Sequence, residues 1–318
     1  MSNYLVTGGA GFIGSNLVER LLDEGHHVRI LDNFSTGKRE NLLQFSNNNK
    51  FELLEGDIRD LHYCQTACKD IDYVLHEAAL GSVPRSIAEP INSNANNVDG
   101  TLNMLVAAKD AKIKRFVCAS SSSVYGNPSD ISPDTPRNED MREGPLSPYA
   151  ITKFAMELYA RRFYSIYGLE TVVLRYFNVF GRRQNPYSQY AAVIPLFVSK
   201  LLKDESITIF GDGETSRDFS YVENVIHANL LACMAPREAA GQVFNIACGQ
   251  RVTLNQMYFK ISQLLEKNIK PNYTNERAGD IKHSLANISK AQLVLGYFPL
   301  YQFDEGIEQT IEWYKTNL

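Results

Sequence analysis

The sequence contains few cysteines, and their spacing matches no metal-binding or redox motif. The five residues are odd in number and form neither a C-x-x-C pair nor a zinc-ribbon pattern: Cys64, Cys68, Cys118, Cys233 and Cys248. We therefore expect reduced, mostly buried thiols rather than a disulfide framework. The 6 histidines form no H-E-x-x-H or comparable ligand set, so no metal site is predicted.

Long apolar runs and an excess of one charge are also missing. No stretch approaches the roughly 18 uninterrupted apolar residues of a membrane-spanning helix. The N-terminus runs from Met-Ser-Asn directly into an apolar strand, without a basic leader. The formal net charge of -4 argues against a general binder of nucleic acid or anionic membranes, although a local basic cluster could hold a small phosphate ligand. We expect a cytoplasmic protein with neither kind of partner.

The sequence does contain a regular alternation of strand-like and helical segments. Apolar runs at 4–7, 28–31, 51–54, 73–76, 115–119 and 171–175 alternate with helical patterns such as 101–111 and 148–167. This order predicts an α/β fold with a doubly wound parallel sheet, the Rossmann type. Loop-rich sequence after Arg175 indicates a smaller C-terminal substrate-binding lobe. We expect residues 1–176 and about 219–248 in the sheet domain, and 177–218 and 249–318 in the lobe.

A glycine-rich loop follows the first strand and opens the first helix. It reads Gly8-x-x-Gly11-x-x-Gly14, a variant of the Rossmann fingerprint, in which glycines allow a tight turn and close approach of the backbone to a pyrophosphate. The following helix N-terminus adds free N–H groups and partial positive charge. The sequence therefore predicts a dinucleotide site.

The residues that follow the next strands refine this prediction. Asp32 lies 18 positions after Gly14 at the end of the second strand, where a carboxylate suits the ribose hydroxyls and repels a 2′-phosphate. This favours NAD over NADP, although Lys38 and Arg39 leave NADP open. Asp57 is placed either to accept from the adenine amino group or simply to begin a helix.

A second motif, Tyr149-x-x-x-Lys153, lies on the helix predicted to begin at Ser147-Pro148. Residues four apart share one helix face. A phenol that acts as a base at neutral pH needs its pKa lowered by roughly 3 units, or about 4 kcal/mol, which a neighbouring ammonium and a cationic nicotinamide could supply. The serine run that ends the strand at 115–119 provides a hydroxyl able to hold both the phenolate and a substrate alcohol.

These motifs together, with Asn97 in Asn-Asn-Val-Asp-Gly-Thr, resemble the extended short-chain dehydrogenase/reductase family. Over essentially the full length the chain resembles the UDP-hexose 4-epimerases. The resemblance selects Ser121, four residues before Tyr125, as the catalytic hydroxyl, with Ser122 and Ser123 able to share the role. Sister 4,6-dehydratases have Asp-Glu at 122 and 123, so the serines argue against dehydration.

The resemblance also assigns the two binding sites. The cofactor set is Gly8, Gly11, Phe12, Ile13, Gly14, Asp32, Asn33, Ser35, Thr36, Gly37, Asp57, Ile58, Ala78, Ala79, Asn97, Tyr149, Lys153 and Phe177. The substrate set is Gly81, Ser121, Tyr149, Asn178, Gln184, Val193, Thr208, Phe210, Arg217, Arg277, Asp280 and Ser284. Within it, Asn178 and the two arginines are implied to hold the diphosphate, with Asp280 on the uridine ribose.

Three positions in the substrate set point to the sugar. Ser284 stands where galactose-type members resemble one another in having a bulky Tyr, Gly81 is small where others have Lys, and Gln184 adds an amide. We therefore expect a UDP-N-acetylhexosamine substrate, epimerised at C4 through a 4-keto intermediate.

Several alternatives stay open at this point. The enzyme could act on UDP-glucose and UDP-galactose, or on the corresponding uronic acids with Lys282 or Arg183 holding a 6-carboxylate. Outside catalysis the chain could be a dinucleotide sensor, although it retains Ser121, Tyr149 and Lys153. The family also pairs its helices at 101–111 and 148–167 with a second copy, which implies a homodimer through a four-helix interface.

Overall fold

The computed structural model describes the chain apart from residues 128–131, 133, 189–190 and 277–281. Its centre is a sheet whose strands follow the order β11-β6-β5-β4-β1-β2-β3, with every neighbouring pair parallel. The strands are β1 (Asn3–Thr7), β2 (His27–Asp32), β3 (Phe51–Glu55), β4 (Tyr73–His76), β5 (Arg115–Ser121), β6 (Thr171–Tyr176) and β11 (Gln242–Ile246). The predicted doubly wound parallel sheet is confirmed, and the segment at 219–248 does return to it as β11.

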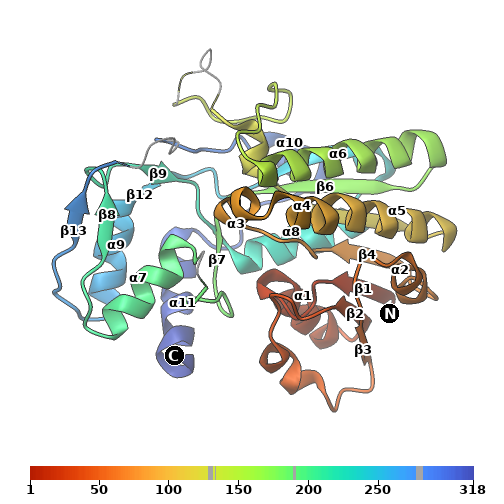
Figure 1. The fold of residues 1–318 in the computed structure, drawn as a ribbon, viewed down its shortest axis with the longest axis horizontal. Coiled ribbons are helices and arrows are strands. Elements are labelled where there is room, and N and C mark those ends of the chain that lie inside the picture. Colours follow the sequence, from red (N-terminus) through yellow and green to blue (C-terminus); the bar gives the residue numbers. More distant parts are fainter. Residues whose placement is uncertain (128–131, 133, 189–190, 277–281) are drawn as a thin grey trace.

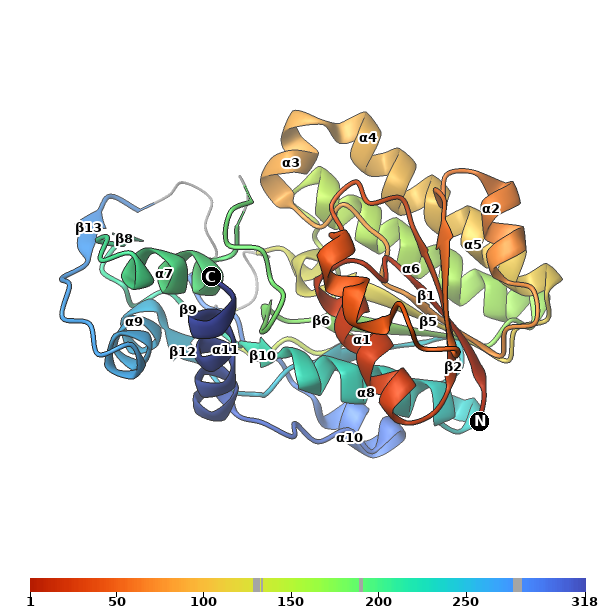
Figure 2. The ribbon, with the colours of Figure 1, turned by 90° about the horizontal axis from the view of Figure 1, so that it is seen from below.

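Helices cover both faces of this sheet, as Figures 1 and 2 show. One face packs against α2 (Leu61–Ala67), α5 (Gly100–Asp110) and α6 (Pro148–Tyr167), the other against α1 (Phe12–Asp23) and α8 (Val222–Met234). Side chains alternate between the faces, so Leu5 of β1 packs with the first set and Val6 with the second. Because both faces are covered, the strands are near-continuous apolar runs.

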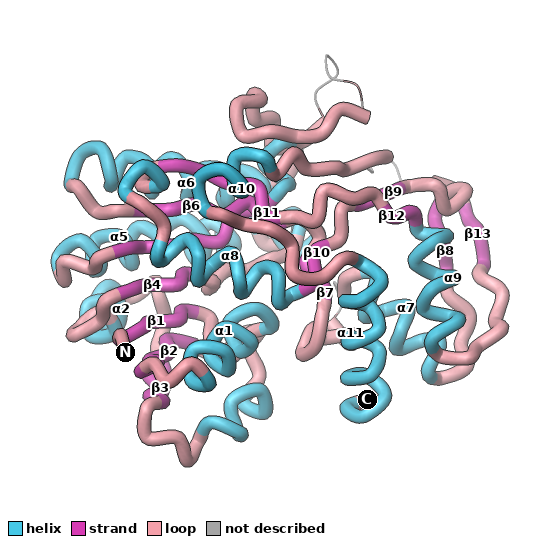
Figure 3. Tube along the Cα trace, turned by 180° about the vertical axis from the view of Figure 1, so that it is seen from behind, coloured by secondary structure: helices cyan, strands magenta, loops and turns pink. Residues whose placement is uncertain are grey.

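The smaller lobe lies beyond the carboxyl edge of the sheet (Figure 3). Its helices are α7 (Val193–Leu202), α9 (Leu254–Leu264) and α11 (Phe303–Asn317). The short strands are β7 (Val179–Phe180), β8 (Thr208–Phe210), β9 (Ser216–Arg217), β10 (Ser220–Tyr221), β12 (Val252–Thr253) and β13 (Asn272–Thr274), paired β10-β7, β12-β9 and β13-β8. Although α10 (Ser289–Leu295) falls in the range expected for this lobe, its residues pack against β11 and α8 of the main lobe.

The remaining helical segments lie on connections of the main lobe. They are α3 (Val83–Ala88), α4 (Pro90–Asn94), the π-helical turn η2 (Ala95–Asp99) and the 3-10 turns η1 (Arg39–Phe45), η3 (Ser122–Tyr125) and η4 (Arg237–Ala239). In the part of the chain that is described, no helix has the length and apolar character needed to cross a bilayer.

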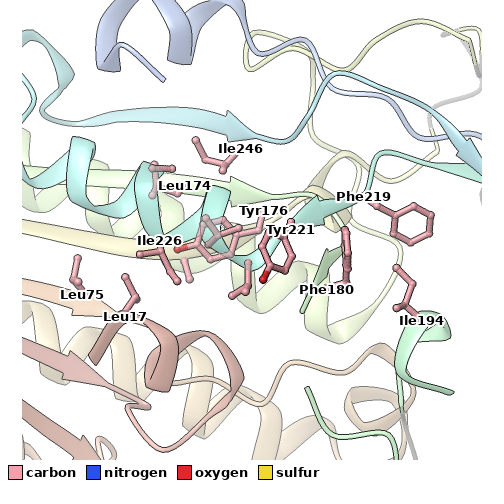
Figure 4. Close-up of a cluster of buried hydrophobic side chains, with 14 of the residues drawn as sticks. Leu17, Leu75, Leu174, Tyr176, Phe180, Ile194, Phe219, Tyr221, Ile226 and Ile246 are labelled. Carbon is pink, nitrogen blue, oxygen red and sulfur yellow. The ribbon is translucent and has the colours of Figure 1, made fainter. Parts of the chain in front are cut away.

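A single apolar core joins the two lobes. Figure 4 shows buried side chains that run from Leu17 and Leu75 in the main lobe, past Tyr176, to Phe219 and Ile194 in the smaller one. Aromatic rings dominate the junction, where the ring centroids of Phe180 and Phe219 are 6.3 Å apart. Burial of such large side chains is worth about 1.5–3 kcal/mol each, so the lobes pack as one unit around the cleft between them.

The ends of α6 are specified locally. The Ser147 hydroxyl accepts a hydrogen bond from the Ala150 amide at 3.2 Å, and Pro148 occupies the first turn. At the other end Gly168 adopts φ +75°, the left-handed conformation that glycine tolerates. These caps begin the helix one residue before Tyr149 and thereby set the direction of that side chain.

Candidate active site

A cavity of about 1160 Å³ lies along the carboxyl ends of β1, β2, β4, β5 and β6 and is closed on its far side by the smaller lobe. This is the crevice where open α/β sheets bind ligands, at the point where the strand order reverses. Most of the predicted site residues line it: Gly8, Gly11, Phe12, Ile13, Gly14, Asp32, Asn33, Ser35, Thr36, Gly37, Ile58, Ala78, Ala79, Gly81, Ser121, Ser122, Ser123, Tyr149, Lys153, Phe177, Asn178, Gln184, Arg217 and Ser284.

The glycine loop is folded so tightly that side chains do not fit. Gly8 adopts φ +70°, and a Cβ there would lie 2.9 Å from the backbone of Ala78. A Cβ on Gly14 would lie 2.2 Å from the Gly8 carbonyl oxygen. The helix that begins at Phe12 therefore presents its free N–H groups to the cavity at close range.

Asp32 connects this loop to the second strand. Its carboxylate accepts hydrogen bonds from the Ala10 amide at 2.9 Å and the Phe34 amide at 2.8 Å. Burial raises the pKa of Asp32, and these two backbone hydrogen bonds act in the opposite direction. The residue is thus a buried acceptor at the rim of the loop, with oxygen lone pairs left for a ligand hydroxyl.

Five predicted residues do not line the cavity: Asp57, Asn97, Val193, Thr208 and Phe210. The Asp57 carboxylate is held by the Arg59 guanidinium at 2.7 Å, which lowers its pKa to about 2. Thr208 and Phe210 belong to β8, whose pairing with β13 lies within the smaller lobe, and Val193 is one residue beyond the lining Ala192. Arg277 and Asp280 lie outside the described residues.

Asn97 has a bridging position behind the cavity wall. It is 1% exposed, its Oδ1 accepts from the Leu80 amide at 2.8 Å, and its Nδ2 donates to the Thr152 hydroxyl at 3.0 Å. The side chain therefore ties the segment after β4 to α6. This contact orients the helix that carries Tyr149 and Lys153.

Tyr149 and Lys153 meet the end of β5. The Lys153 ammonium donates to the Ala119 carbonyl at 2.7 Å. Burial raises the pKa of Tyr149, and a hydrogen bond with the Ser121 hydroxyl lowers it. Burial also lowers the pKa of Lys153, and the negative charge of nearby groups, chiefly Glu77, raises it. Phenol, ammonium and hydroxyl converge, as the spacing of the motifs predicts.

The serine run divides its hydroxyls between core and cavity. Ser120 turns inward and donates to Glu157, which forms a buried ion pair with Arg175 at 2.7 Å. The next three serines line the cavity, and the Ser121 Oγ accepts from the Ser123 amide at 3.2 Å. The buried pair anchors β5 and β6 to α6, so the position of the Ser121 hydroxyl is fixed by the packing around it.

Glu77 is a cavity residue that the sequence motifs do not reveal. It follows β4, and its carboxylate accepts from the Tyr176 hydroxyl at 2.7 Å, which itself accepts from Asn229 at 2.7 Å. Burial raises the pKa of Glu77 to about 7, opposed by Tyr176 and by the charge of Lys153. An acidic residue directly after a parallel strand is the one signal that could have identified it.

The smaller lobe contributes polar side chains from separate loops. Asn178, at φ +34°, donates to the Asp218 carbonyl at 2.9 Å, and Arg217 donates to the Ser216 carbonyl at 2.9 Å. Gln184 donates from Nε2 to the Val179 carbonyl at 3.1 Å. Its buried Oε1 has no hydrogen-bond partner among the described residues.

A second unforeseen residue, Arg137, lies in the wall formed by the loop after η3. Its side chain lines the cavity but is only 4% exposed, and burial lowers its pKa. The two residues considered for a 6-carboxylate lie elsewhere. Arg183 donates to the Ser15 carbonyl and pairs with Glu19 at 3.1 Å, and Lys282 is exposed and does not line the cavity.

Residues 4–247 match the NAD dependent epimerase/dehydratase family. The structure superposes with a TM-score of 0.93 on that of a UDP-N-acetylglucosamine 4-epimerase from Methanobrevibacter ruminantium M1, which was solved in complex with UDP-N-acetylmuramic acid. The two sequences are 43% identical, and the match covers 100% of this chain and 99% of the other. The sequence is 36% identical to UDP-glucose 4-epimerase of Mycolicibacterium smegmatis over 98% of each chain. It is 34% identical to UDP-glucuronate 4-epimerase of Thermodesulfobacterium geofontis, over 100% of this chain and 98% of that one.

Proposed function

Because the chain belongs to the NAD dependent epimerase/dehydratase family, as one of its UDP-sugar 4-epimerases, we propose that it inverts C4 of UDP-N-acetylhexosamines. The reaction would interconvert UDP-N-acetylglucosamine and UDP-N-acetylgalactosamine. It is redox-neutral, since the hydrogen removed from C4 returns to the opposite face of the same carbon.

The residues around the glycine loop fit NAD. Added Cβ atoms would collide at Gly8 and Gly14, so only this backbone leaves a cradle for a pyrophosphate. The Asp32 carboxylate suits the ribose hydroxyls, and it would repel the 2′-phosphate of NADP. When bound, NAD supplies the acceptor and donor for one hydride at C4.

Tyr149 acts in this proposal as the base that removes the proton of the 4-hydroxyl. Ser121 shares a hydrogen bond with the phenol and is placed to hold the sugar oxygen. Lys153 is held by the Ala119 carbonyl one helical turn from Tyr149, and in this proposal its positive charge favours the ionised phenol. The 4-keto sugar then rotates about its link to the diphosphate, and Tyr149 returns the proton.

The observation that carries the choice of sugar is the buried Oε1 of Gln184, which has no hydrogen-bond partner among the described residues. The Nε2 atom is committed to the Val179 carbonyl, so the amide cannot simply turn over to satisfy its oxygen. A buried acceptor is stabilised most by a ligand donor that points at it. The 2-acetamido group has a fixed N–H donor, whereas a 2-hydroxyl can donate only after its proton rotates into place. Ser284 and Gly81 are small enough to leave room for that group.

The test is incubation of the purified enzyme with UDP-N-acetylglucosamine, without added reductant, followed by proton NMR of the sugar. We expect UDP-N-acetylgalactosamine to appear at equilibrium. A Tyr149→Phe variant should lose about 10²–10⁴-fold in kcat while still binding UDP. Conversion of UDP-glucose with no turnover of either acetylated sugar would refute the sugar, and full activity of the variant would refute the mechanism.

The proposed assembly is a homodimer through α5 and α6. The outward side of α6 exposes large apolar side chains, including Ile151 at 55%, Leu158 at 44% and Ile166 at 66%. Such a patch is costly in water and supports a helix-to-helix contact with a second copy. Light scattering should give twice the 35.8 kDa chain mass, and Ile166→Glu should shift it toward the monomer.

A further inference from the structure

Arg137 is a buried cation in the cavity wall that has no counter-ion among the described residues. Its Nη1 and Nη2 atoms are buried and have no hydrogen-bond partner anywhere in the described chain. Buried guanidinium groups are normally paired, since an unpaired charge in a low-dielectric wall is strongly unfavourable. A residue of this kind in the lining of a ligand cavity indicates that its partner is part of the ligand.

The backbone of Arg137 is held rigidly, so the side chain is placed in advance of binding. Its amide donates to the Leu285 carbonyl at 2.8 Å, and its carbonyl accepts from the Asn287 amide at 2.8 Å and the Asn245 side chain at 2.9 Å. Three separate segments of the chain therefore meet at this residue. Such preorganisation is typical of binding groups.

The chain segment 283–286 gives the spacing between Arg137 and Arg217. Residue 283 is bridged to Ser216, next to Arg217, and residue 286 is bridged to Arg137. Three residues of extended chain span about 10 Å, and Ser284 lies between the two bridges. If Arg217 holds the diphosphate, Arg137 faces the sugar.

Three carboxylates on the surrounding loop have other partners. Glu139 accepts from the Asn245 amide at 2.7 Å, Glu143 pairs with Arg175 at 2.7 Å, and Asp134 pairs with Arg251 at 2.7 Å. No internal anion of the described chain therefore neutralises Arg137. The positive charge is available to an incoming group.

We propose that Arg137 recognises a carboxylate carried by the sugar, and so extends the substrate range of the site to acidic UDP-sugars. A guanidinium and a carboxylate form paired, charge-assisted hydrogen bonds that a neutral hydroxymethyl group cannot reproduce. The carboxylate can be C6 of a uronate or an acid linked through a ring hydroxyl. This inference rests on the proposed function, because it assumes that a UDP-sugar occupies the cavity.

The experiment measures binding by calorimetry to the NAD-loaded enzyme. The ligands are UDP-N-acetylglucosamine, the same molecule oxidised to the C6 carboxylate, UDP-N-acetylmuramic acid, and UDP alone. The variants are Arg137→Gln and Arg137→Lys. Arg251→Gln is the matched control, because Arg251 anchors the same loop but does not line the cavity. Thermal unfolding reports the fold of each variant.

We expect Arg137→Gln to weaken at least one acidic ligand about tenfold or more, with less than about twofold change for UDP-N-acetylglucosamine and UDP. Arg137→Lys should recover part of the loss, and Arg251→Gln should change nothing. The acidic ligand that loses affinity identifies the source of the carboxylate.

Equal loss for all ligands, UDP included, would assign Arg137 to the diphosphate or to the fold and overturn the inference. So would wild-type enzyme that binds both acidic ligands more weakly than the neutral one, a comparison that needs no variant. Because binding is measured, an enzyme that fails to epimerise acetylated sugars refutes the proposed function alone. Normal epimerisation with an unchanged affinity ratio refutes this inference alone.

Discussion

The two walls of the cavity are built in different ways. The wall formed by β1, β2 and β4 is backbone held close by glycines, as at Gly14, where no side chain fits. The opposite wall consists of side chains, such as Arg137, Gln184 and Ser284, that come from loops far apart in the sequence. The first wall is determined by local geometry, and the second by long-range packing.

The second wall has an internal support that joins segments far apart in the sequence. Asp218 is fully buried and accepts hydrogen bonds from the amides of Cys248 and Gly249 at 3.0 Å and of Ala286 at 3.2 Å. One carboxylate thus ties together the segments that carry Arg217 and Ser284. We therefore expect substitutions in the first wall to lower activity toward every substrate alike. Substitutions in the second wall should change the affinity for the sugar nucleotide and the choice between sugars.

Gly14→Ala tests the first wall and should have the largest effect on ligand affinity. The new Cβ would lie 2.2 Å from the Gly8 carbonyl oxygen, so the loop must open. We expect NAD affinity to fall about 1,000-fold, or about 4 kcal/mol, as measured by fluorescence titration. Gly81→Ala is the control, because its Cβ meets nothing within 4 Å. Unchanged NAD binding in Gly14→Ala would show that the loop is not a cofactor cradle.

Asp218→Ala tests the support of the second wall. Three amides, of which that of Ala286 is buried, lose their acceptor, which should lower the free energy of unfolding by about 2–4 kcal/mol in urea titrations. Sugar-nucleotide affinity should fall more than NAD affinity. Asp110→Ala, at a half-exposed carboxylate, should cost less than about 1 kcal/mol. An equal loss of both affinities would mean that the two walls are not independent.

Ser284→Tyr tests the volume of the second wall. A phenol added at this lining residue should lower kcat/KM for UDP-N-acetylglucosamine about 10–100-fold relative to UDP-glucose, because it competes with the acetamido group for space. NAD affinity should not change. Ser284→Ala should keep the ratio within about threefold. A Tyr variant with the wild-type ratio would place the 2-substituent elsewhere.

Glu77→Gln should have the smallest effect, on the pH dependence of stability in the cofactor-free protein. Because burial raises the pKa of Glu77 to about 7, the folded protein keeps a proton that the unfolded chain releases above about pH 4.5. Stability is therefore highest below that pH and falls as pH rises to about 7. We expect Gln to remove about 1–2 kcal/mol of this fall, measured by urea unfolding from pH 5 to 8.

Asp218 serves as an internal reference in that measurement. Burial raises its pKa to about 6, so it contributes a fall of the same sign that Glu77→Gln leaves in place. A variant with the full wild-type slope would show that Glu77 is already ionised in the folded state. Comparison of the two slopes would then separate the contribution of Glu77, in the first wall, from that of Asp218, which supports the second wall.

The doubly wound parallel sheet, the glycine loop and the Tyr149 helix could be predicted because each depends on local signals. Short stretches of sequence contain the signals that predict them: near-continuous apolar strands, glycine spacing and the Ser147-Pro148 cap. The position of Asn97 behind the wall, rather than in it, could not be predicted. Its partners Leu80 and Thr152 are brought to it only by the packing of α6 on the segment after β4.

By itself the sequence determined the fold class, the dinucleotide cradle and the convergence of Ser121, Tyr149 and Lys153, because strand periodicity, backbone freedom and helix spacing act over a few residues. Tertiary structure alone decided which charges face the ligand. Arg183 forms an ion pair with Glu19, whereas Arg137 lies in the cavity wall with no counter-ion in the part of the chain that is described. The physical reason is that the cost of burying a charge depends on every group around it, and those groups come from distant parts of the chain.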